Sequence, residues 1–188
     1  MAFSPGALRL TSALEALNDG GVVACPTEAV WGLSCDPQNP RAVMRLLQLK
    51  QRPVAKGLIL VAADTSQLEF LLEDLPLQQR EQLTATWPGP ATWLVPHHDR
   101  VAPWIRGVHS AVAVRVTAHP VVSALCQAWG GPLVSTSANP AGAQPARACF
   151  QVHRYFGEAL DSILPGAIGS SDKPTEIRDL ASGRVIRA

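Results

Sequence analysis

Short apolar runs alternate with helical apolar patterns along the whole chain. Five runs have the length and residue types of buried strands, namely residues 22–25, 57–63, 91–96, 111–116 and 132–135. Between them, apolar residues recur at helical spacing after start signals at Ser4-Pro5, Asn39-Pro40, Asp64, Pro76 and His119. The C-terminal part adds a helix near 147–157 and short strands around 175–178 and 184–187. This alternation predicts an α/β fold, with helices covering a sheet.

Polar clusters follow the predicted strands at the points where they end. Thr27 and Glu28 follow the first strand, "KQRPVAKG" at 50–57 precedes the second, and "STSAN" at 135–139 closes the strand that begins at 132. Within "AVAVRV", alternation places Arg115 on the face opposite the neighbouring valines. Since ligands of open α/β sheets bind beyond the strand ends, we expect these clusters to line one cavity.

The size and charge of the chain limit what it can be. Its 188 residues suit one domain spanning 1–188, and no repeat, linker or low-complexity tract divides it. Only 16% of residues are charged and the net charge is +1, which does not favour a dedicated nucleic-acid coat. Any anion site must therefore come from local clustering.

The sequence predicts a cytoplasmic protein without a membrane span. No apolar run reaches membrane length, and the N-terminus lacks the basic and apolar regions of a secretory signal. The four cysteines (Cys25, Cys35, Cys126 and Cys149) are widely spaced and form no C-x-x-C pair. We expect reduced thiols that bind no metal.

The polar clusters have plain structural interpretations as well as chemical ones. Lys50 and Arg52 could interact with the dipole at a helix C-terminus, and "STSAN" could satisfy its own backbone. Together, however, the clusters supply the point charge, planar donor and neutral donors that a polyphosphate needs. No familiar phosphate loop, dinucleotide fingerprint or Ser–His–Asp grouping is present. The combination favours transfer at phosphorus, catalysed by positioning and charge neutralisation.

The chain resembles the YrdC/TsaC family of threonylcarbamoyl-AMP synthases, in its compact bacterial form. The resemblance runs from about residue 20 to 187 and is carried by six strings in order: "PTEAVWGLSCDP", "LLQLKQRPVAKGLILVAA", "WPGPATW", "AVRVTAHPVV", "PLVSTSANPAG" and "EIRD…RVIR". It implies a YrdC-like single domain, in which a twisted, open mixed sheet is flanked by helices and holds a large basic concave cavity.

The resemblance also implies site residues. The K-x-R and S-x-N tetrad of catalytic, ATP-binding residues falls on Lys50, Arg52, Ser137 and Asn139. Further ATP contacts are expected from Lys56, Thr175 and Arg187, and the sequence leaves open whether the segment at 174–179 closes over ATP as a lid. Threonine contacts are expected from Thr27, Arg115 and Ser135.

The implied reaction is that of a nucleotidyltransferase. L-Threonine, bicarbonate and ATP give threonylcarbamoyl-AMP and pyrophosphate, the first step of N6-threonylcarbamoyladenosine formation at tRNA position 37. Mg2+ is expected to bind mainly through the ATP phosphates, because no carboxylate pair is apparent. The expected downstream partner is the complex that transfers the threonylcarbamoyl group to tRNA.

The chain departs from the family pattern at two positions, and two alternative functions stay open. Ala29 replaces the second threonine of P-T-E-T, and Ala141 replaces a serine that follows the S-x-N element. Neither touches the tetrad. The alternatives are an ATP-dependent enzyme for another amino acid, and a protein that binds double-stranded RNA or tRNA, or matures ribosomes, with the same basic cavity.

Overall fold

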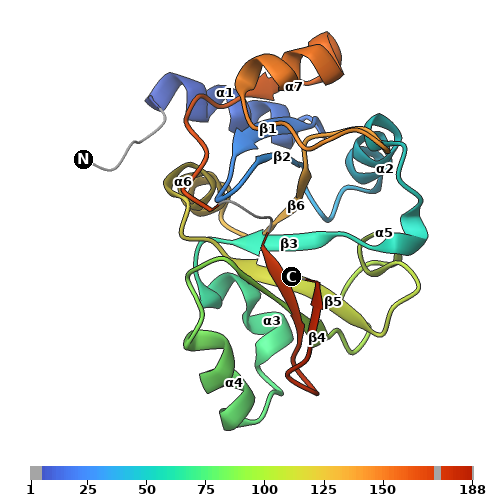
Figure 1. Cartoon of the computed structure of the whole chain (residues 1–188), viewed down its shortest axis with the longest axis vertical. Coiled ribbons are helices and arrows are strands. Elements are labelled where there is room, and N and C mark those ends of the chain that lie inside the picture. Colours follow the sequence, from blue (N-terminus) through green and yellow to red (C-terminus); the bar gives the residue numbers. More distant parts are fainter. Residues whose placement is uncertain (1–5, 172–174, 188) are drawn as a thin grey trace.

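The computed structural model describes residues 6–171 and 175–187. Within them, one mixed sheet has the strand order β7-β1-β2-β6-β3-β5-β4-β8-β9 (Figure 1). The strands are β1 (Val23–Pro26), β2 (Trp31–Ser34), β3 (Ile59–Ala62), β4 (Ala91–Pro96), β5 (Ala111–Val116), β6 (Leu133–Ser137), β7 (Ser162–Ile163), β8 (Glu176–Asp179) and β9 (Val185–Arg187). The pairs β1–β7, β3–β5 and β4–β8 are parallel, and the other pairs are antiparallel.

Helices surround the sheet at both ends of the molecule (Figure 1). They are α1 (Ala7–Asn18), α2 (Pro40–Lys50), α3 (Glu69–Leu72), α4 (Leu77–Thr84), α5 (Pro103–Arg106), α6 (Pro120–Trp129) and α7 (Cys149–Phe156), with 3-10 turns η1 (Val54–Lys56), η2 (Thr65–Leu68) and η3 (Gly157–Ala159). The predicted α/β architecture of a mixed sheet flanked by helices is confirmed.

Helix α2 illustrates how local sequence sets an element that later carries the site. The Asn39 side chain accepts hydrogen bonds from the backbone N–H groups of Arg41 (3.0 Å) and Ala42 (3.2 Å), and Pro40 occupies the first turn. Gln51 adopts a left-handed conformation (φ 52°) and ends the helix directly after Lys50. The sequence pattern therefore fixes where Lys50 lies along the chain.

Three elements were not predicted, and each is short or irregular. Strand β2 contains Gly32 and lies inside a segment that the sequence presents as a polar cluster. Helix α5 has four residues and β7 has two, too few to show a period. The predicted start signal at Ser4-Pro5 lies outside the described residues.

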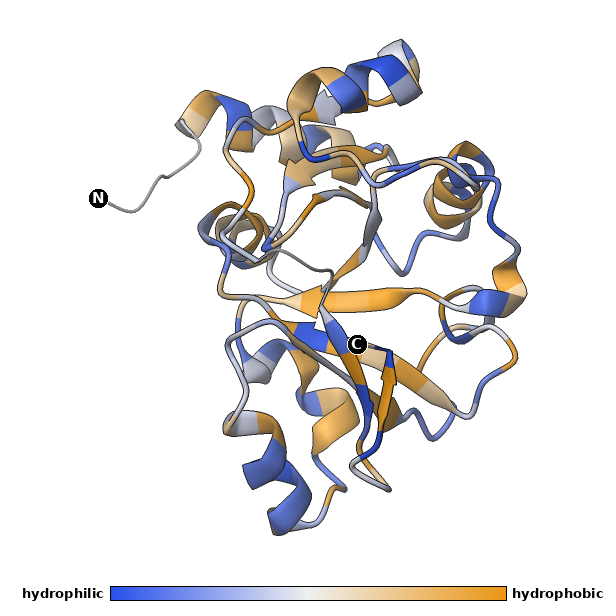
Figure 2. Cartoon of the chain, in the orientation of Figure 1, coloured by the Kyte–Doolittle hydropathy of each residue, from blue (hydrophilic) through white to orange (hydrophobic). Residues whose placement is uncertain are grey.

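The two faces of β5 have different environments. Val112, Val114 and Val116 are buried in the larger core cluster, together with residues of α2 and α3. Ala111, Ala113 and Arg115 alternate with them and belong to the opposite face. Arg115 therefore lies opposite the valines, as predicted. Figure 2 shows the apolar character of β3 and β5 at the centre of the molecule.

Strand β6 joins the two halves of the sheet. Its first residues pair with β3, with Leu133 opposite Val61, and its last residues pair with β2, with Ser137 opposite Gly32. The partner strands β2 and β3 therefore lie on opposite sides of β6. The "STSAN" segment begins where these two halves of the sheet meet.

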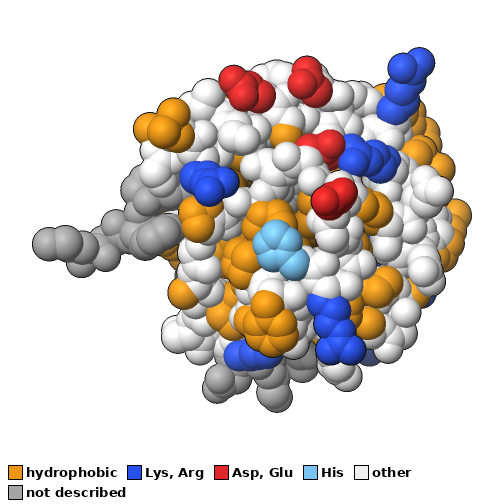
Figure 3. All heavy atoms as spheres, turned by 90° about the horizontal axis from the view of Figure 1, so that it is seen from above, with side chains coloured by type: hydrophobic (Ala, Val, Ile, Leu, Met, Phe, Trp, Pro, Cys, Tyr) orange, Lys and Arg blue, Asp and Glu red, His pale blue; other side chains and the backbone are white. Residues whose placement is uncertain are grey.

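The remaining expectations concern membranes, cysteines and surface charge. No helix in the described ranges is long and apolar enough to cross a membrane. All four cysteines are free thiols, as predicted, and Cys25, Cys35 and Cys126 are buried. On the face seen from above in Figure 3, acidic and basic side chains are interspersed and neither sign forms a continuous patch.

Candidate active site

A cavity of about 770 Å³ lies against the side of β5 that carries Ala111, Ala113 and Arg115. This volume falls in the range typical of small-molecule sites. Leu94 of β4, Ile177 of β8 and residues at the end of β6 also line this cavity.

The cavity lining is rich in cations. Among the described residues that line it are five Lys or Arg side chains and one carboxylate: Arg52, Lys56, Arg106, Arg115, Arg187 and Asp179. Burial and the nearby Arg187 lower the pKa of Arg52, and burial and Arg115 lower the pKa of Arg187. The guanidinium groups therefore repel one another in a partly desolvated space, and an anionic ligand would relieve this repulsion.

Arg52 is held in place by the turn that follows it. Its Nη2 donates to the carbonyl oxygen of Gly57 at 2.9 Å, and its Nε donates to the same oxygen at 3.3 Å. Gly57 adopts a positive φ of 62° that suits glycine, so the turn presents this carbonyl without strain. The "KQRPVAKG" segment thus orients its own arginine.

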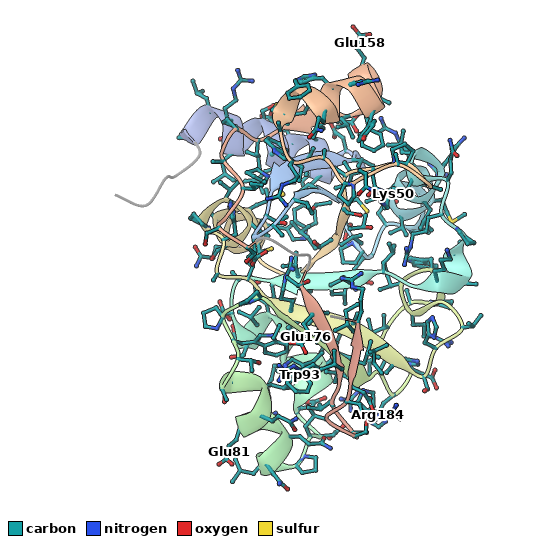
Figure 4. The ribbon with its side chains drawn as sticks, in the orientation of Figure 1. Lys50, Glu81, Trp93, Glu158, Glu176 and Arg184 are labelled. Atoms are coloured by element: carbon teal, nitrogen blue, oxygen red, sulfur yellow. The ribbon has the colours of Figure 1, made fainter. Side chains whose placement is uncertain are left out.

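Lys50 lies beneath the cavity wall rather than in its lining. Its side chain is buried at the end of α2, and its Nζ donates to the carbonyl oxygens of Ser137 and Asn139, the latter at 2.9 Å (Figure 4). The Lys50 carbonyl in turn accepts from the N–H of Ala141 at 2.9 Å. Burial, with a contribution from Arg52, lowers the pKa of Lys50 to about 8. Lys50 therefore fastens the loop after β6 to α2.

Asn139 organises the same loop from within. Its Oδ1 accepts from the Ser137 hydroxyl at 2.6 Å, and its Nδ2 donates to the carbonyl oxygens of Pro140 (3.1 Å) and Ala143 (2.8 Å). Ser137 lines the cavity, whereas Asn139 lies outside the lining. The loop thus presents the Ser137 hydroxyl in an orientation set by Asn139.

Arg115 is a buried cation within the cavity lining. Its side chain is 6% exposed, its Nη2 lies 3.4 Å from the Glu28 carboxylate, and its Nη1 donates to the Thr175 hydroxyl at 3.0 Å. Arg187 donates to the carbonyl oxygen of Thr175 at 3.0 Å. These contacts connect β5 with the segment that leads into β8 and with β9.

The structure brings most of the sequence-predicted residues to one cavity. Eight of them line it: Thr27, Arg52, Lys56, Arg115, Ser135, Ser137, Thr175 and Arg187. Lys50 and Asn139 lie next to it and hold its loop. Thr136 also lines the cavity, whereas Ala138 is buried in the core.

The segment from 105 to 111 was not identified from the sequence. It contributes Ile105, Arg106, Val108, His109 and Ser110 to the lining. Val108 is 78% exposed, and Ile186 on β9, also in the lining, is 60% exposed. The only signal in the sequence was the glycine at 107, which marks a turn without indicating a site.

The described part of the chain holds no group of three or more His, Cys, Asp or Glu side chains arranged for a metal ion. Asp179 is the carboxylate of the described cavity lining. It already accepts hydrogen bonds from the Ser182 hydroxyl (2.5 Å) and N–H (3.1 Å). A metal would therefore need most of its ligands from a bound substrate and water.

Fold and site together define an α/β protein with a cation-lined cavity of small-molecule size. The Sua5/YciO/YrdC family model, described as "Telomere recombination", matches residues 15–188. The chain belongs to this family. Threonylcarbamoyl-AMP synthase of Pseudomonas paraeruginosa is 59% identical over 95% of this chain and 96% of the relative. The same enzyme of Marinobacter nauticus is 55% identical over 98% and 97%.

Solved structures of the family have the same fold. Sua5 of P. abyssi in complex with L-threonine superposes with a TM-score of 0.86 at 29% identity, covering 94% of this chain and 52% of that one. This chain thus spans about half the length of that Sua5 chain. E. coli YciO, at 23% identity, has a TM-score of 0.86 and is covered over 95% of its length.

Proposed function

We propose that this protein is a threonylcarbamoyl-AMP synthase, a nucleotidyltransferase acting on L-threonine, bicarbonate and ATP. The observation that carries the proposal is the convergence of Arg52, Lys56, Arg115 and Ser137 on one cavity in a chain that is 59% identical to an enzyme of that name. The cation-rich lining suits a polyphosphate, and the apolar Val108 and Ile186 at the cavity offer surface for a base.

The reaction needs positioning more than it needs a protein nucleophile. The threonine amine reacts with bicarbonate to give an N-carboxylate and water, and this carboxylate attacks the α-phosphorus of ATP while pyrophosphate leaves. Arg52, Lys56 and Arg187 neutralise the phosphate charge that develops. Their attraction to this charge is strong because the cavity is partly desolvated. The Ser137 hydroxyl orients the α-phosphate by turning its single O–H donor from Oδ1 of Asn139 to a phosphate oxygen.

Threonine is assigned to the enclosed end of the cavity. Arg115 binds its carboxylate, and Thr27 and Ser135 are its neighbours in the lining. The complex of P. abyssi Sua5 with L-threonine supports this class of ligand. Ala29 is 2% exposed, so a hydroxyl at this position would not face the cavity freely, and its loss leaves the proposed contacts intact.

Lys50 and Asn139 act in this proposal through the loop that they hold. Two of the three N–H donors of Lys50 bind backbone carbonyls, and Lys50 acts on the phosphates through its positive charge, since it lies outside the lining. Mg2+ would bind mainly to the ATP phosphates, with Asp179 as the carboxylate within the lining, and would neutralise the charge of the leaving pyrophosphate. The product would pass to a tRNA-modifying transfer complex in the cytoplasm.

One assay tests the proposal against its alternatives. The protein is incubated with ATP, bicarbonate and each of several amino acids, while pyrophosphate release and adenylate formation are measured. Pyrophosphate released with threonine alone is the expected result. Release with another amino acid would indicate a different substrate. No release, together with tRNA binding that weakens steeply with salt, would favour the RNA-binding alternative.

A further inference from the structure

Glu28 is a buried carboxylate directly behind the cavity wall. Its side chain is 8% exposed and it is absent from the lining, although the preceding residue, Thr27, lines the cavity. One carboxylate oxygen accepts from the Thr117 hydroxyl at 2.6 Å, and the other lies 3.4 Å from Nη2 of Arg115. No step of the proposed reaction uses this carboxylate, so its burial needs another explanation.

Glu28 is ionised at neutral pH. Burial opposes its ionisation, but Arg115 and the Thr117 hydroxyl outweigh this effect and lower the pKa of Glu28 below its ordinary value. A buried ion pair is costly to desolvate and is by itself weak evidence of a contribution to stability. A role in the site is the better reason for keeping this charge.

The backbone at Thr27 and Glu28 is held by hydrogen bonds from residues 169–171. The N–H of Ser171 donates to the Glu28 carbonyl at 3.1 Å, and the N–H of Gly169 donates to the Thr27 carbonyl at 2.9 Å. A Cβ at Gly169 would lie 2.7 Å from the Glu28 carbonyl oxygen, so the two segments pack closely. The carboxylate therefore has a rigid base from which to hold a partner.

Arg115 is that partner: Nη1 is held by a hydrogen bond, whereas Nη2 forms an ion pair with Glu28 without a hydrogen bond. Its Nη1 donates to Thr175, whose hydroxyl lies 3.2 Å from that of Thr92, and its Nη2 faces Glu28. A guanidinium has five N–H donors in a planar fork, so donors remain for a ligand in the cavity. Without Glu28, repulsion from Arg187 would be uncompensated.

We propose that Glu28 is a positioning residue that holds the Arg115 guanidinium in its orientation and thereby sets the affinity of the site for the substrate carboxylate. This inference rests on the proposed function, in which Arg115 binds the carboxylate of threonine. Glu28 itself does not touch the substrate. Its effect is on binding of the amino acid, rather than on binding of ATP or on the phosphoryl-transfer step.

Glu28→Gln tests the inference, because it removes the charge and preserves the size of the side chain. We expect the KM for threonine to rise about tenfold, while kcat stays within about threefold and the KM for ATP within about twofold. Glu158→Gln is the matched control, since Glu158 is exposed at the far end of the molecule (Figure 4) and should leave all three constants unchanged.

A second pair of variants separates positioning from folding. In an Arg115→Lys background, Glu28→Gln should change the KM for threonine by less than about twofold, because the group that it positions is already altered. If Glu28→Gln does not fold, Thr117→Val removes the hydroxyl that holds the carboxylate and that also accepts from the N–H of His119. Its KM for threonine should rise about threefold with kcat retained.

Several outcomes would overturn the inference. One is a lower midpoint of thermal unfolding with an unchanged KM for threonine, which would indicate a purely structural role. Another is a lower KM for threonine in Glu28→Gln, which would mean that Glu28 only competes for Arg115. If the wild-type protein instead uses another amino acid, the proposed function is wrong, but the KM for that amino acid still decides the role of Glu28.

Discussion

At the scale of the residue, the cations of the site divide into two kinds. Arg52 and Arg115 line the cavity with their guanidinium groups held by a carbonyl oxygen or a carboxylate. Lys50 is buried and uses two of its donors on the loop after β6. In the proposed function, the same positive charge would therefore bind substrate directly at two positions and support the binding loop at a third.

The pKa of Lys50 leads to a prediction about pH. Because burial lowers this pKa to about 8, the side chain loses its proton and its positive charge beside the cavity as the pH rises above that value. We expect kcat/KM to fall above pH 8 in the wild-type protein, and this fall to be absent from Lys50→Arg, whose guanidinium stays charged. The ratio of the two profiles, measured from about pH 6 to about pH 10, cancels titration of the substrates.

Stability has its own pH dependence at this residue. Lys50 titrates at about 8 in the folded chain against an ordinary value of 10.5, so the unfolded chain binds the proton more tightly. The resulting destabilisation is fully present below pH 8 and disappears between about pH 8 and 10.5. A parallel loss of activity and of stability above pH 8 would therefore contradict the assignment of the pKa to Lys50.

At the scale of the element, the cavity rim depends on a close approach between η1 and α5. The N–H of Leu58 donates to the Ile105 carbonyl at 2.8 Å, and the N–H of Val108 donates to the Ala55 carbonyl at 3.3 Å. Gly107 lies between these bonds with φ 62° and ψ −132°, a conformation essentially restricted to glycine. This contact places the 105–111 segment against the cavity.

Gly107→Ala should therefore be more damaging than an alanine at an open glycine. A Cβ at Gly107 would lie 2.5 Å from the Ala55 carbonyl oxygen, whereas a Cβ at Gly130, with φ 84°, would have no other atom within 4 Å. We expect Gly130→Ala to lower the free energy of unfolding by about 1 kcal/mol and Gly107→Ala by about 3 kcal/mol. Urea denaturation of both variants measures the difference. Equal losses of the free energy of unfolding in the two variants would mean that the backbone around Gly107 accepts the added Cβ without an extra energetic cost.

At the scale of the whole molecule, the cavity is built from strands of both halves of the sheet. Gly32 belongs to β2, Ile59 to β3 and Arg187 to β9, and all three line it. A ligand in the cavity therefore contacts segments that lie far apart in the sequence. Binding should stabilise the fold as a unit, because such contacts exist only in the folded chain.

ATP should raise the midpoint of thermal unfolding. At a concentration about 100 times its Kd the stabilisation is about 2.7 kcal/mol, which corresponds to about 5 to 10 °C for a chain of this size. Arg52→Ala should lose most of this shift, and Arg154→Ala, on the exposed side of α7, should keep it. An undiminished shift in Arg52→Ala would remove Arg52 from the proposed ATP site.

The sequence alone determined the periodic elements and the chemistry that they carry. Apolar periodicity and the Asn39 cap located α2, alternation placed Arg115 opposite the valines, and the motifs indicated the cations and the "STSAN" loop. These features are local, because a helix cap or a strand face depends on neighbours a few residues away.

Only the tertiary structure decided which of those residues line the cavity and which support it from behind. Glu28 and Arg115 are 87 positions apart, and Lys50 reaches carbonyl groups 87 and 89 positions along the chain. No periodicity relates such distant residues; sheet pairing brings them together, with β6 joining β2 to β3. The contact between η1 and α5 adds the unpredicted residues 105–110 to the cavity. Sheet pairing also buries Lys50 and Glu28 behind a wall that the sequence presents only as polar clusters.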